Sequence, residues 1–258
     1  MNKLFAAGSY LKYRINAKGK NEVHSPFAFD LLTNVILDET PYYDFDLIES
    51  MRAKLLLDRT KIHVDDFGTG RKYRLETIAS IARHALMPKK YAQLLFRLVS
   101  RFRVQTILEL GTSLGITTLY LSFPGKKNRI FTLEGCSGIA AIAQKNFDRL
   151  NRENIELIVG EFDVALPKAL SKTDRLDLVI FDGNHRGLAT VSYFEKCLPY
   201  AHDESIFVFD DIHWSSDMQE AWKKIAANPA VSLSIDLYQL GIIFFRSGMT
   251  KQDLSLKF

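Results

Sequence analysis

Ile107-Leu-Glu-Leu-Gly-Thr-Ser-Leu-Gly115 leads directly into Ile116-Thr-Thr-Leu-Tyr-Leu121, and this stretch decides the fold. The apolar residues before Gly111 predict a buried strand, and those after Gly115 predict a helix. Gly111 allows a tight turn and a close approach of a ligand to the backbone. Gly115 opens the helix, whose free N–H groups attract an anionic group. Two glycines four residues apart are weak evidence alone, so the surrounding pattern has to support them.

Beyond residue 104 the sequence alternates between short β-type runs and helical stretches, which predicts a mostly parallel sheet covered on both faces. The last two runs are separated only by Leu237 to Leu240, too short for a helical crossover, so we expect an antiparallel hairpin. The predicted fold is α/β and doubly wound, with a mostly parallel seven-stranded sheet, an antiparallel C-terminal hairpin and an N-terminal helical extension. The predicted strands are 106–110, 129–133, 155–159, 176–181, 206–209, 232–236 and 241–245, with helices near 115–122, 137–151, 163–171, 187–198 and 215–227.

The N-terminal part of the chain, before residue 104, has a different hydrophobic pattern. Its apolar residues recur at helical spacing, which predicts four or so helices. We divide the chain into 1–90, a helical cap that selects substrate, and 91–258, the larger domain. With 258 residues, 47% hydrophobic and 25% charged, the composition excludes a disordered or collagenous protein. No apolar run approaches a membrane span, and Leu4 to Ala7 is too short for an export signal, so we expect a cytoplasmic protein without a membrane partner.

The charge is uneven along the chain. Residues 1–105 carry 18 Lys+Arg and 11 Asp+Glu, a net of +7, whereas residues 106–258 carry 16 and 19, a net of −3. A basic front half is able to face nucleic acid, an anionic substrate or an acidic partner, and a solvated helical surface is the alternative. Within it, Asp65-Asp-Phe-Gly-Thr-Gly70 is interpreted as a turn or hairpin loop that belongs to a substrate lid.

Acidic residues follow the predicted strands in order. Glu134 ends the second strand, 23 residues after Gly111, where an acid accepts both hydroxyls of a ribose. Glu161 or Asp163, after the third strand, is able to accept from the exocyclic amine of adenine. Each acid alone is better explained as a helix cap, and the ordered series is what favours a nucleoside site.

A second group of acids follows the fourth and fifth predicted strands. Asp182 comes after the fourth, and Asp210 and Asp211 come after the fifth. Clustered carboxylates repel, so at neutral pH they need a proton, a base or a cation such as Mg²⁺. The alternative is that they are turn residues that cap helices. His185 and His213 stand nearby as candidate bases, with hydrogen-bonded loop residues as the alternative.

Over about residues 91–246 the chain resembles the class I S-adenosylmethionine-dependent methyltransferases. The resemblance rests on Glu109-x-Gly111-x-x-x-Gly115, on Glu134, on the acids after the third strand and on the terminal hairpin. It implies a Rossmann-like methyltransferase fold and S-adenosyl-L-methionine as the cofactor. The cofactor-binding residues that it implies are Glu109, Gly111, Thr112, Ser113, Gly115, Glu134, Gly135, Cys136, Glu161, Phe162 and Asp182.

The acid group resembles that of the catechol O-methyltransferase-like branch, which implies a divalent cation on Asp182, Asp210 and Asp211. The pair after the fifth strand is Asp-Asp rather than Asp-Asn, and His185 stands where the catechol enzyme has a lysine. This arrangement is closer to bacterial O-methyltransferases. It implies O-methylation of a small-molecule hydroxyl, with His185 as the base and Asp182 and His213 as further catalytic candidates.

Two other functions stay open at this point. One is a methyltransferase of RNA or another nucleic acid that uses the basic front half, although Asp182-Gly-Asn-His does not match the Asn/Asp-Pro-Pro-Tyr/Phe motif of base-methylating members. The other is a nucleoside-binding module without catalysis. Members of this family often form homodimers, so we also expect a homodimer here.

Overall fold

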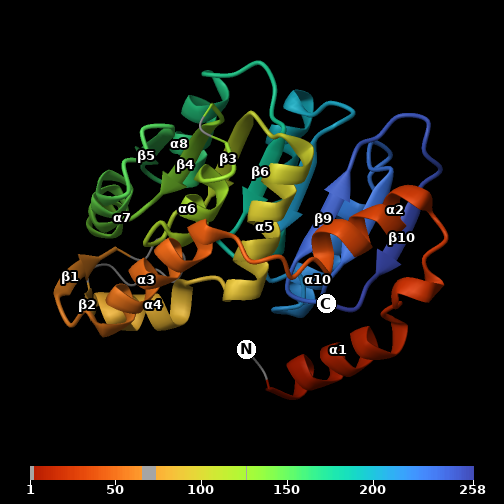
Figure 1. Cartoon of the computed structure of the whole chain (residues 1–258), viewed down its shortest axis with the longest axis horizontal. Helices are drawn as coiled ribbons and strands as arrows, with labels where there is room; N and C mark the ends of the chain where they lie inside the picture. The colour runs from red at the N-terminus through yellow and green to blue at the C-terminus, as the bar shows by residue number, and fades with distance from the viewer. Residues whose placement is uncertain (1–2, 66–73, 126) are drawn as a thin grey trace. The chain divides into compact units, whose positions relative to one another are not determined.

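The computed structural model describes residues 3–65, 74–125 and 127–258, and Figure 1 shows its helices and strands. The main sheet has eight strands in the order β10-β8-β9-β7-β6-β3-β4-β5. β9 runs antiparallel to both β7 and β8, while the β3–β4, β4–β5, β6–β7 and β8–β10 pairs are parallel. The strands are β3 (Thr106–Leu110), β4 (Arg129–Glu134), β5 (Ile155–Val159), β6 (Leu178–Phe181), β7 (Ile206–Phe209), β8 (Leu233–Asp236), β9 (Gly241–Phe244) and β10 (Gln252–Ser255).

The doubly wound α/β fold and the antiparallel β8–β9 hairpin predicted from the sequence are confirmed. The predicted number of seven strands is too low by one, because β10 adds an eighth strand parallel to β8. Gln252-Asp-Leu-Ser255 carries one apolar residue and no β-branched residue, so its sequence gives no strand pattern. Pairing with β8, rather than local preference, makes this segment a strand.

The chain forms two compact units, residues 39–174 and residues 1–38 with 175–258. These units differ from the division into residues 1–90 and 91–258 that the sequence suggested. That division concerns substrate selection and stays a prediction. Each unit is described below by itself. In the described ranges, no helix combines the length and the apolar character that crossing a bilayer requires.

In the unit of residues 39–174, each of β3, β4 and β5 is followed by a helix, and the core is built around the buried rings of Tyr120, Phe131 and Phe147. β1 and β2 pair as an antiparallel hairpin. Most of the predicted Asp65–Gly70 loop lies outside the described residues, since 66–73 are not described. The elements are α3 (Tyr43–Leu57), β1 (Lys61–Val64), β2 (Arg74–Thr77), α4 (Ile78–Ala85), α5 (Lys89–Phe102), α6 (Ile116–Ser122), α7 (Ser137–Arg149) and α8 (Phe162–Leu170).

In the other unit, stacked and tilted aromatic rings fill the core between strands and helices. The rings of Phe181 and Phe209 on neighbouring strands stack with centroids 4.4 Å apart, and Phe194 packs on Phe209 from α9. Such pairs stabilise a core beyond the area that they bury. The helices are α1 (Lys3–Asn16), α2 (Pro26–Leu31), one π-helical turn (Leu32–Ile36), α9 (Gly187–Cys197) and α10 (Ser216–Ala226), with short 3₁₀ turns at Lys20–Glu22 and Leu198–Tyr200.

Candidate active site

The loop between β3 and α6 needs the two glycines predicted from the sequence. Gly111 has a φ of 110° and Gly115 a φ of 84°, in the left-handed region that side chains other than glycine rarely adopt. A Cβ atom on Gly115 would lie 2.6 Å from Cε1 of Phe147 on α7. Gly111 and Thr112 each donate a backbone N–H to the carbonyl of Leu133, 3.0 Å away, which fixes the loop against the end of β4.

Glu109, at the end of β3, is completely buried beside this loop. Its Oε2 accepts from the hydroxyls of Thr118 at 2.5 Å and Thr132 at 2.6 Å, and Oε1 has no hydrogen-bond partner among the described residues. Burial, opposed by these two hydrogen bonds, raises the pKa of Glu109 to about 7. The Oγ atom of Ser113 is also buried without a described partner. The loop therefore presents one carboxylate oxygen and one hydroxyl that a ligand is able to satisfy.

Thr112 has a different role in the same loop. It is buried, and its hydroxyl lies 2.6 Å from that of Thr132. Its side chain therefore belongs to the hydroxyl chain that leads to Glu109, and only its backbone remains to face a ligand.

Glu134 joins the two loops at the ends of β3 and β4. Its Oε2 accepts the backbone N–H of Ser113 and its Oε1 that of Cys136, each at 2.9 Å. Burial raises the pKa of Glu134, and the backbone hydrogen bonds oppose this shift. Two carboxylate oxygens offer about four lone-pair directions, so Glu134 keeps acceptor capacity after these two bonds.

The end of β5 reaches the same edge of the sheet. Gly160 donates its N–H to the carbonyl of Glu134 at 2.9 Å, and α8 begins directly afterwards. Glu161 is exposed, and its side chain does not cap α8, while Phe162 and Gly135 are partly buried. Of the eleven cofactor residues named from the sequence, ten therefore lie at the ends of β3, β4 and β5 or directly after them, and Asp182 lies in the other unit.

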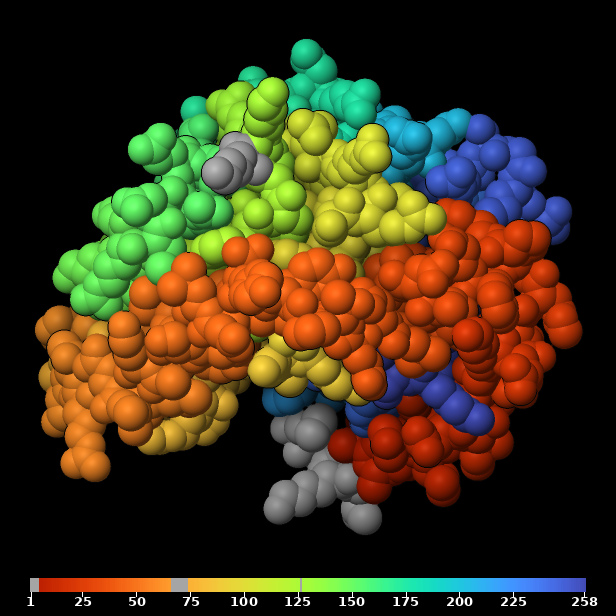
Figure 2. All heavy atoms as spheres, viewed as in Figure 1, coloured from red at the N-terminus to blue at the C-terminus, as the bar shows by residue number. Residues whose placement is uncertain are grey.

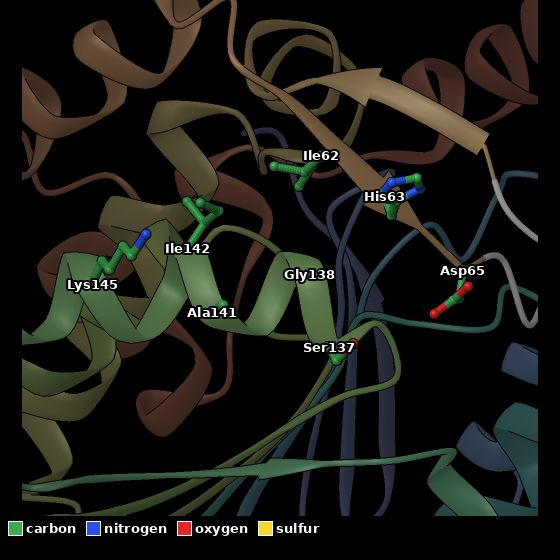
Figure 3. A pocket seen from close by; sticks show the side chains of 8 residues that line it. All are labelled: Ile62, His63, Asp65, Ser137, Gly138, Ala141, Ile142 and Lys145. Atoms are coloured by element: carbon green, nitrogen blue, oxygen red, sulfur yellow. The ribbon is translucent and has the colours of Figure 1, made fainter.

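A pocket of about 700 Å³ lies between β1 and the first turns of α7, and Figure 3 shows Asp65 and Lys145 near its opposite ends. Gly138 allows the close approach of the strand, because a Cβ atom there would overlap the carbonyl oxygen of His63. The Sγ of Cys136 accepts the N–H of Asp65 at 3.4 Å and lies 3.7 Å from that same carbonyl. The sequence does not reveal this side of the pocket, because it depends on a contact between β1 and α7, which are far apart along the chain.

The acid group predicted from the sequence forms in the other unit. Asp210 is buried, and its N–H donates to the carbonyl of Phe181 at 2.9 Å, which fixes it beside the end of β6. Burial, the charges of Asp182 and Asp211 and a hydrogen bond with Asp182 raise the pKa of Asp210 well above its ordinary value. Burial and the neighbouring carboxylates therefore favour the neutral form of Asp210.

His185 and Asp211 form the accessible part of this group. Nδ1 of His185 lies 3.7 Å from Oδ2 of Asp211, and both side chains are partly exposed. Burial raises the pKa of Asp211, and the charge of His185 opposes the shift. The indole ring of Trp214, which is 42% exposed, lies with its centroid 6.4 Å from that of His185. A solute that reaches the imidazole therefore meets an aromatic surface beside it.

The second candidate base, His213, is held by other groups. Its Nε2 lies 2.8 Å from Oδ2 of Asp236, and its Nδ1 lies 3.0 Å from the hydroxyl of Ser9 and 2.8 Å from Nε2 of Gln219. Its ring stacks on Tyr238 with centroids 5.1 Å apart. Both ring nitrogens thus have partners, which fits a positioning role, and a catalytic role for His213 stays a prediction.

The loop that carries His185 is locked to the start of α10. Gly187 donates its N–H to Oδ2 of Asp217 at 2.6 Å, and a Cβ atom on Gly187 would lie 2.5 Å from the carbonyl oxygen of Asp217. Ser215 caps the same helix by accepting from the N–H of Met218. This contact holds the loops after β6 and β7 together, and it was not predicted from the sequence.

The three carboxylates do not fit a divalent cation as they are arranged. Across residues 3–65, 74–125 and 127–258, no group of three or more His, Cys, Asp or Glu side chains is placed to hold a metal ion. Oδ1 of Asp210 is buried without a hydrogen-bond partner among the described residues. The cation on Asp182, Asp210 and Asp211 stays a prediction, and no step below depends on it.

The strand order, with the glycine loop after β3 and the acid at the end of β4, is that of a Rossmann-like methyltransferase fold. Residues 108–212 match a family profile described as a methyltransferase domain. The matched methyltransferase domain therefore lies within a Rossmann-like methyltransferase fold.

Named relatives agree with this class. A catechol O-methyltransferase from Niastella koreensis is 29% identical over 126 residues, 48% of this chain and 55% of that protein, so the chain spans about half the length of the curated relative. The O-methyltransferase from Bacillus cereus, solved in complex with SAH, has 19% identity and a TM-score of 0.57 over 84% of this chain and 97% of its own. The O-methyltransferase TomG from Streptomyces achromogenes, solved with SAM, has 18% identity and a TM-score of 0.56 over 63% of this chain and 82% of its own. At these identities the solved structures show the shared fold.

Proposed function

We propose that this chain transfers the methyl group of S-adenosylmethionine to a hydroxyl group of a small molecule. The observation that carries the proposal is the pair of buried, unsatisfied polar atoms on the glycine loop, Oε1 of Glu109 and Oγ of Ser113. A carboxylate and a hydroxyl beside a tight backbone turn suit the ammonium and carboxylate groups of an amino acid. The methionine part of the cofactor has both groups.

The remaining cofactor contacts follow from the same edge of the sheet. Glu134, already fixed by two backbone N–H groups, accepts from the ribose hydroxyls with its remaining lone pairs. Cys136 and Phe162 supply apolar surface for the adenine ring, and Glu161 accepts from its amino group. When bound, the cofactor would supply a methyl group activated by its sulfonium charge, and the neutral thioether of S-adenosylhomocysteine would be the leaving group.

The protein's part in the chemistry is to remove the acceptor's proton. His185 takes the proton of the acceptor hydroxyl, and Asp211, 3.7 Å away, stabilises the imidazolium that forms. The raised pKa of Asp210 favours its neutral form, which lowers the negative charge next to this base. Trp214 beside His185 and Leu188, which is 85% exposed, give the acceptor an apolar surface to lie on. We therefore propose an acceptor whose hydroxyl is attached to a flat or apolar body.

The other parts of the proposal come from the sequence and from relatives. The catechol O-methyltransferase and the two O-methyltransferase structures support oxygen as the methylated atom. The comparisons favour neither a nucleic-acid methyltransferase nor a non-catalytic module. The cytoplasmic location, the homodimer and the divalent cation stay predictions of the sequence.

Titration calorimetry with S-adenosylhomocysteine tests the cofactor site. We expect binding to the wild-type protein, a loss of at least tenfold in affinity for Glu134→Ala, and unchanged affinity for Glu153→Ala, an exposed glutamate used as a matched control. No binding at millimolar ligand would refute the function, and equal binding by Glu134→Ala would refute the ribose assignment. A screen of hydroxyl acceptors with labelled cofactor then identifies the substrate, and its product must carry the label on oxygen.

A further inference from the structure

Helix α1 is fixed to its own unit through one face. The hydroxyl of Tyr13 donates to the carbonyl of Leu256 at 2.5 Å, and that of Tyr238 donates to the carbonyl of Ala6 at 3.1 Å. Ser9, on the same face by its spacing from Tyr13, lies 3.0 Å from Nδ1 of His213. These contacts place Ala6, Ser9 and Tyr13 on the inner side of the helix.

The opposite face of α1 is also apolar, and it is open. Leu11 is 62% exposed and Ile15 is 75% exposed, and at a spacing of four residues they lie on one side of the helix. At about 100° per residue, they lie about 140° and 180° around the helix from Ala6. A single exposed aliphatic residue is ordinary, but two adjacent ones diametrically opposite a docked face form a second apolar stripe.

Cations surround this stripe without any acid. Residues 1–21 contain five Lys+Arg and no Asp or Glu. Lys12 and Arg14, on either side of the stripe, are both exposed, and so is Lys18, two residues beyond the end of the helix. Figure 2 shows this red segment at the surface beside the blue C-terminal residues. Pairing of the stripe with a second copy of α1 would bring like charges together, so the charge favours a negatively charged occupant.

We propose that α1 lies in the plane of an anionic lipid surface, with Leu11 and Ile15 inserted and Lys12, Arg14 and Lys18 at the headgroups. A helix with an aliphatic stripe flanked by long cations suits this geometry, because the cations extend to the phosphates while their stems stay in the apolar layer. An acidic protein would satisfy the charges equally, but it would not require an aliphatic stripe along the centre of the cationic face. The inference is independent of the proposed methyl transfer.

Sedimentation with vesicles of phosphatidylcholine, with or without 30% phosphatidylserine, tests the proposal on the full chain. We expect binding only to the anionic vesicles, weakening as salt is raised. Lys12→Gln with Arg14→Gln should reduce the affinity by about 25-fold, at roughly fivefold per cation. Leu11→Ser with Ile15→Ser should reduce it by about tenfold or more. Leu57→Ser, a control at a leucine that is 80% exposed on α3, should bind like the wild type.

Several results would overturn this assignment. They are a wild-type protein that stays in the supernatant at low salt, a Leu11→Ser/Ile15→Ser variant that binds as well as the wild type, and binding to soluble polyglutamate as tight as to vesicles. The last result would assign the face to an acidic protein. Circular dichroism of each variant checks that α1 and the unit around it remain folded. Because the assay needs no cofactor, its failure is separate from failure of the proposed enzyme activity.

Discussion

Replacing Glu109 with glutamine should remove a pH-dependent cost of folding. Burial raises the pKa of Glu109 from 4.5 to about 7, so between these values the unfolded chain has already released the proton that the folded protein still holds. The wild-type protein therefore loses stability as the pH rises from about 4.5 through about 7, and the loss stays constant above that. About 2.5 pKa units at about 1.4 kcal/mol each amount to roughly 3 kcal/mol. Glutamine does not titrate, and its carbonyl oxygen is able to accept from Thr118 and Thr132.

Urea unfolding of both proteins at pH 5 and pH 8 measures this difference. The free energy of unfolding of Glu109→Gln relative to the wild type should rise by roughly 2–3 kcal/mol between the two pH values, since part of the change lies below pH 5. All other titrating groups are common to both proteins, so the comparison isolates Glu109. Glu153→Gln, at an exposed position, should follow the wild type. A difference between Glu109→Gln and wild type that is constant with pH would refute the argument that burial of this carboxyl controls its protonation.

Three further predictions concern the loops of the site. Gly115→Ala should lower the free energy of unfolding by roughly 2–4 kcal/mol, because alanine is strained at this positive φ and its Cβ overlaps the ring of Phe147. Adding Phe147→Leu to the same chain should recover part of the loss in urea unfolding. Strictly additive effects of the two substitutions on the urea midpoint would contradict this. Gly187→Ala should disturb the contact with Asp217 and lower kcat, while the affinity for S-adenosylhomocysteine measured by calorimetry stays unchanged. A parallel loss of this affinity would show that the contact shapes the cofactor site as well. His185→Ala should lower kcat by roughly 10²–10⁴ in the initial-rate assay, because the acceptor hydroxyl loses its base. Activity of the wild type that is lost to chelator and restored by Mg²⁺ would assign the proton step to a cation instead.

The strands from β3 to β9 could be predicted because each carries its own signal. Leu178–Phe181 and Ile206–Phe209 are continuous apolar runs, as expected for strands buried on both faces, and their ends fall where the sequence turns polar. The glycine loop was also predictable from local sequence, because a turn with positive φ favours glycine. In these segments the local sequence pattern and the tertiary structure favour the same backbone conformation.

The parts that were missed depend on contacts between distant residues. Helix α1 has apolar residues on two opposite faces, so its sequence shows no single stripe of helical period. The Gly187–Asp217 contact joins residues 30 positions apart, and the approach of His63 to Gly138 joins residues 75 positions apart. The hydrogen bond between Glu134 and the backbone of Ser113 was partly predictable. The sequence places both residues at one edge of the sheet, but it does not predict the bond itself.

The eighth strand has a consequence for how copies of this chain behave in concentrated solution. β8 is a largely buried strand in which apolar and polar residues alternate, and β10 satisfies its outer row of backbone N–H and C=O groups. The outermost strand instead presents Gln252 and Asp253, a polar and charged border that discourages edge-to-edge addition of another molecule. Deleting residues 251–258 would leave β8 as an unprotected template, and such a truncation should aggregate by strand pairing even where the remainder stays folded.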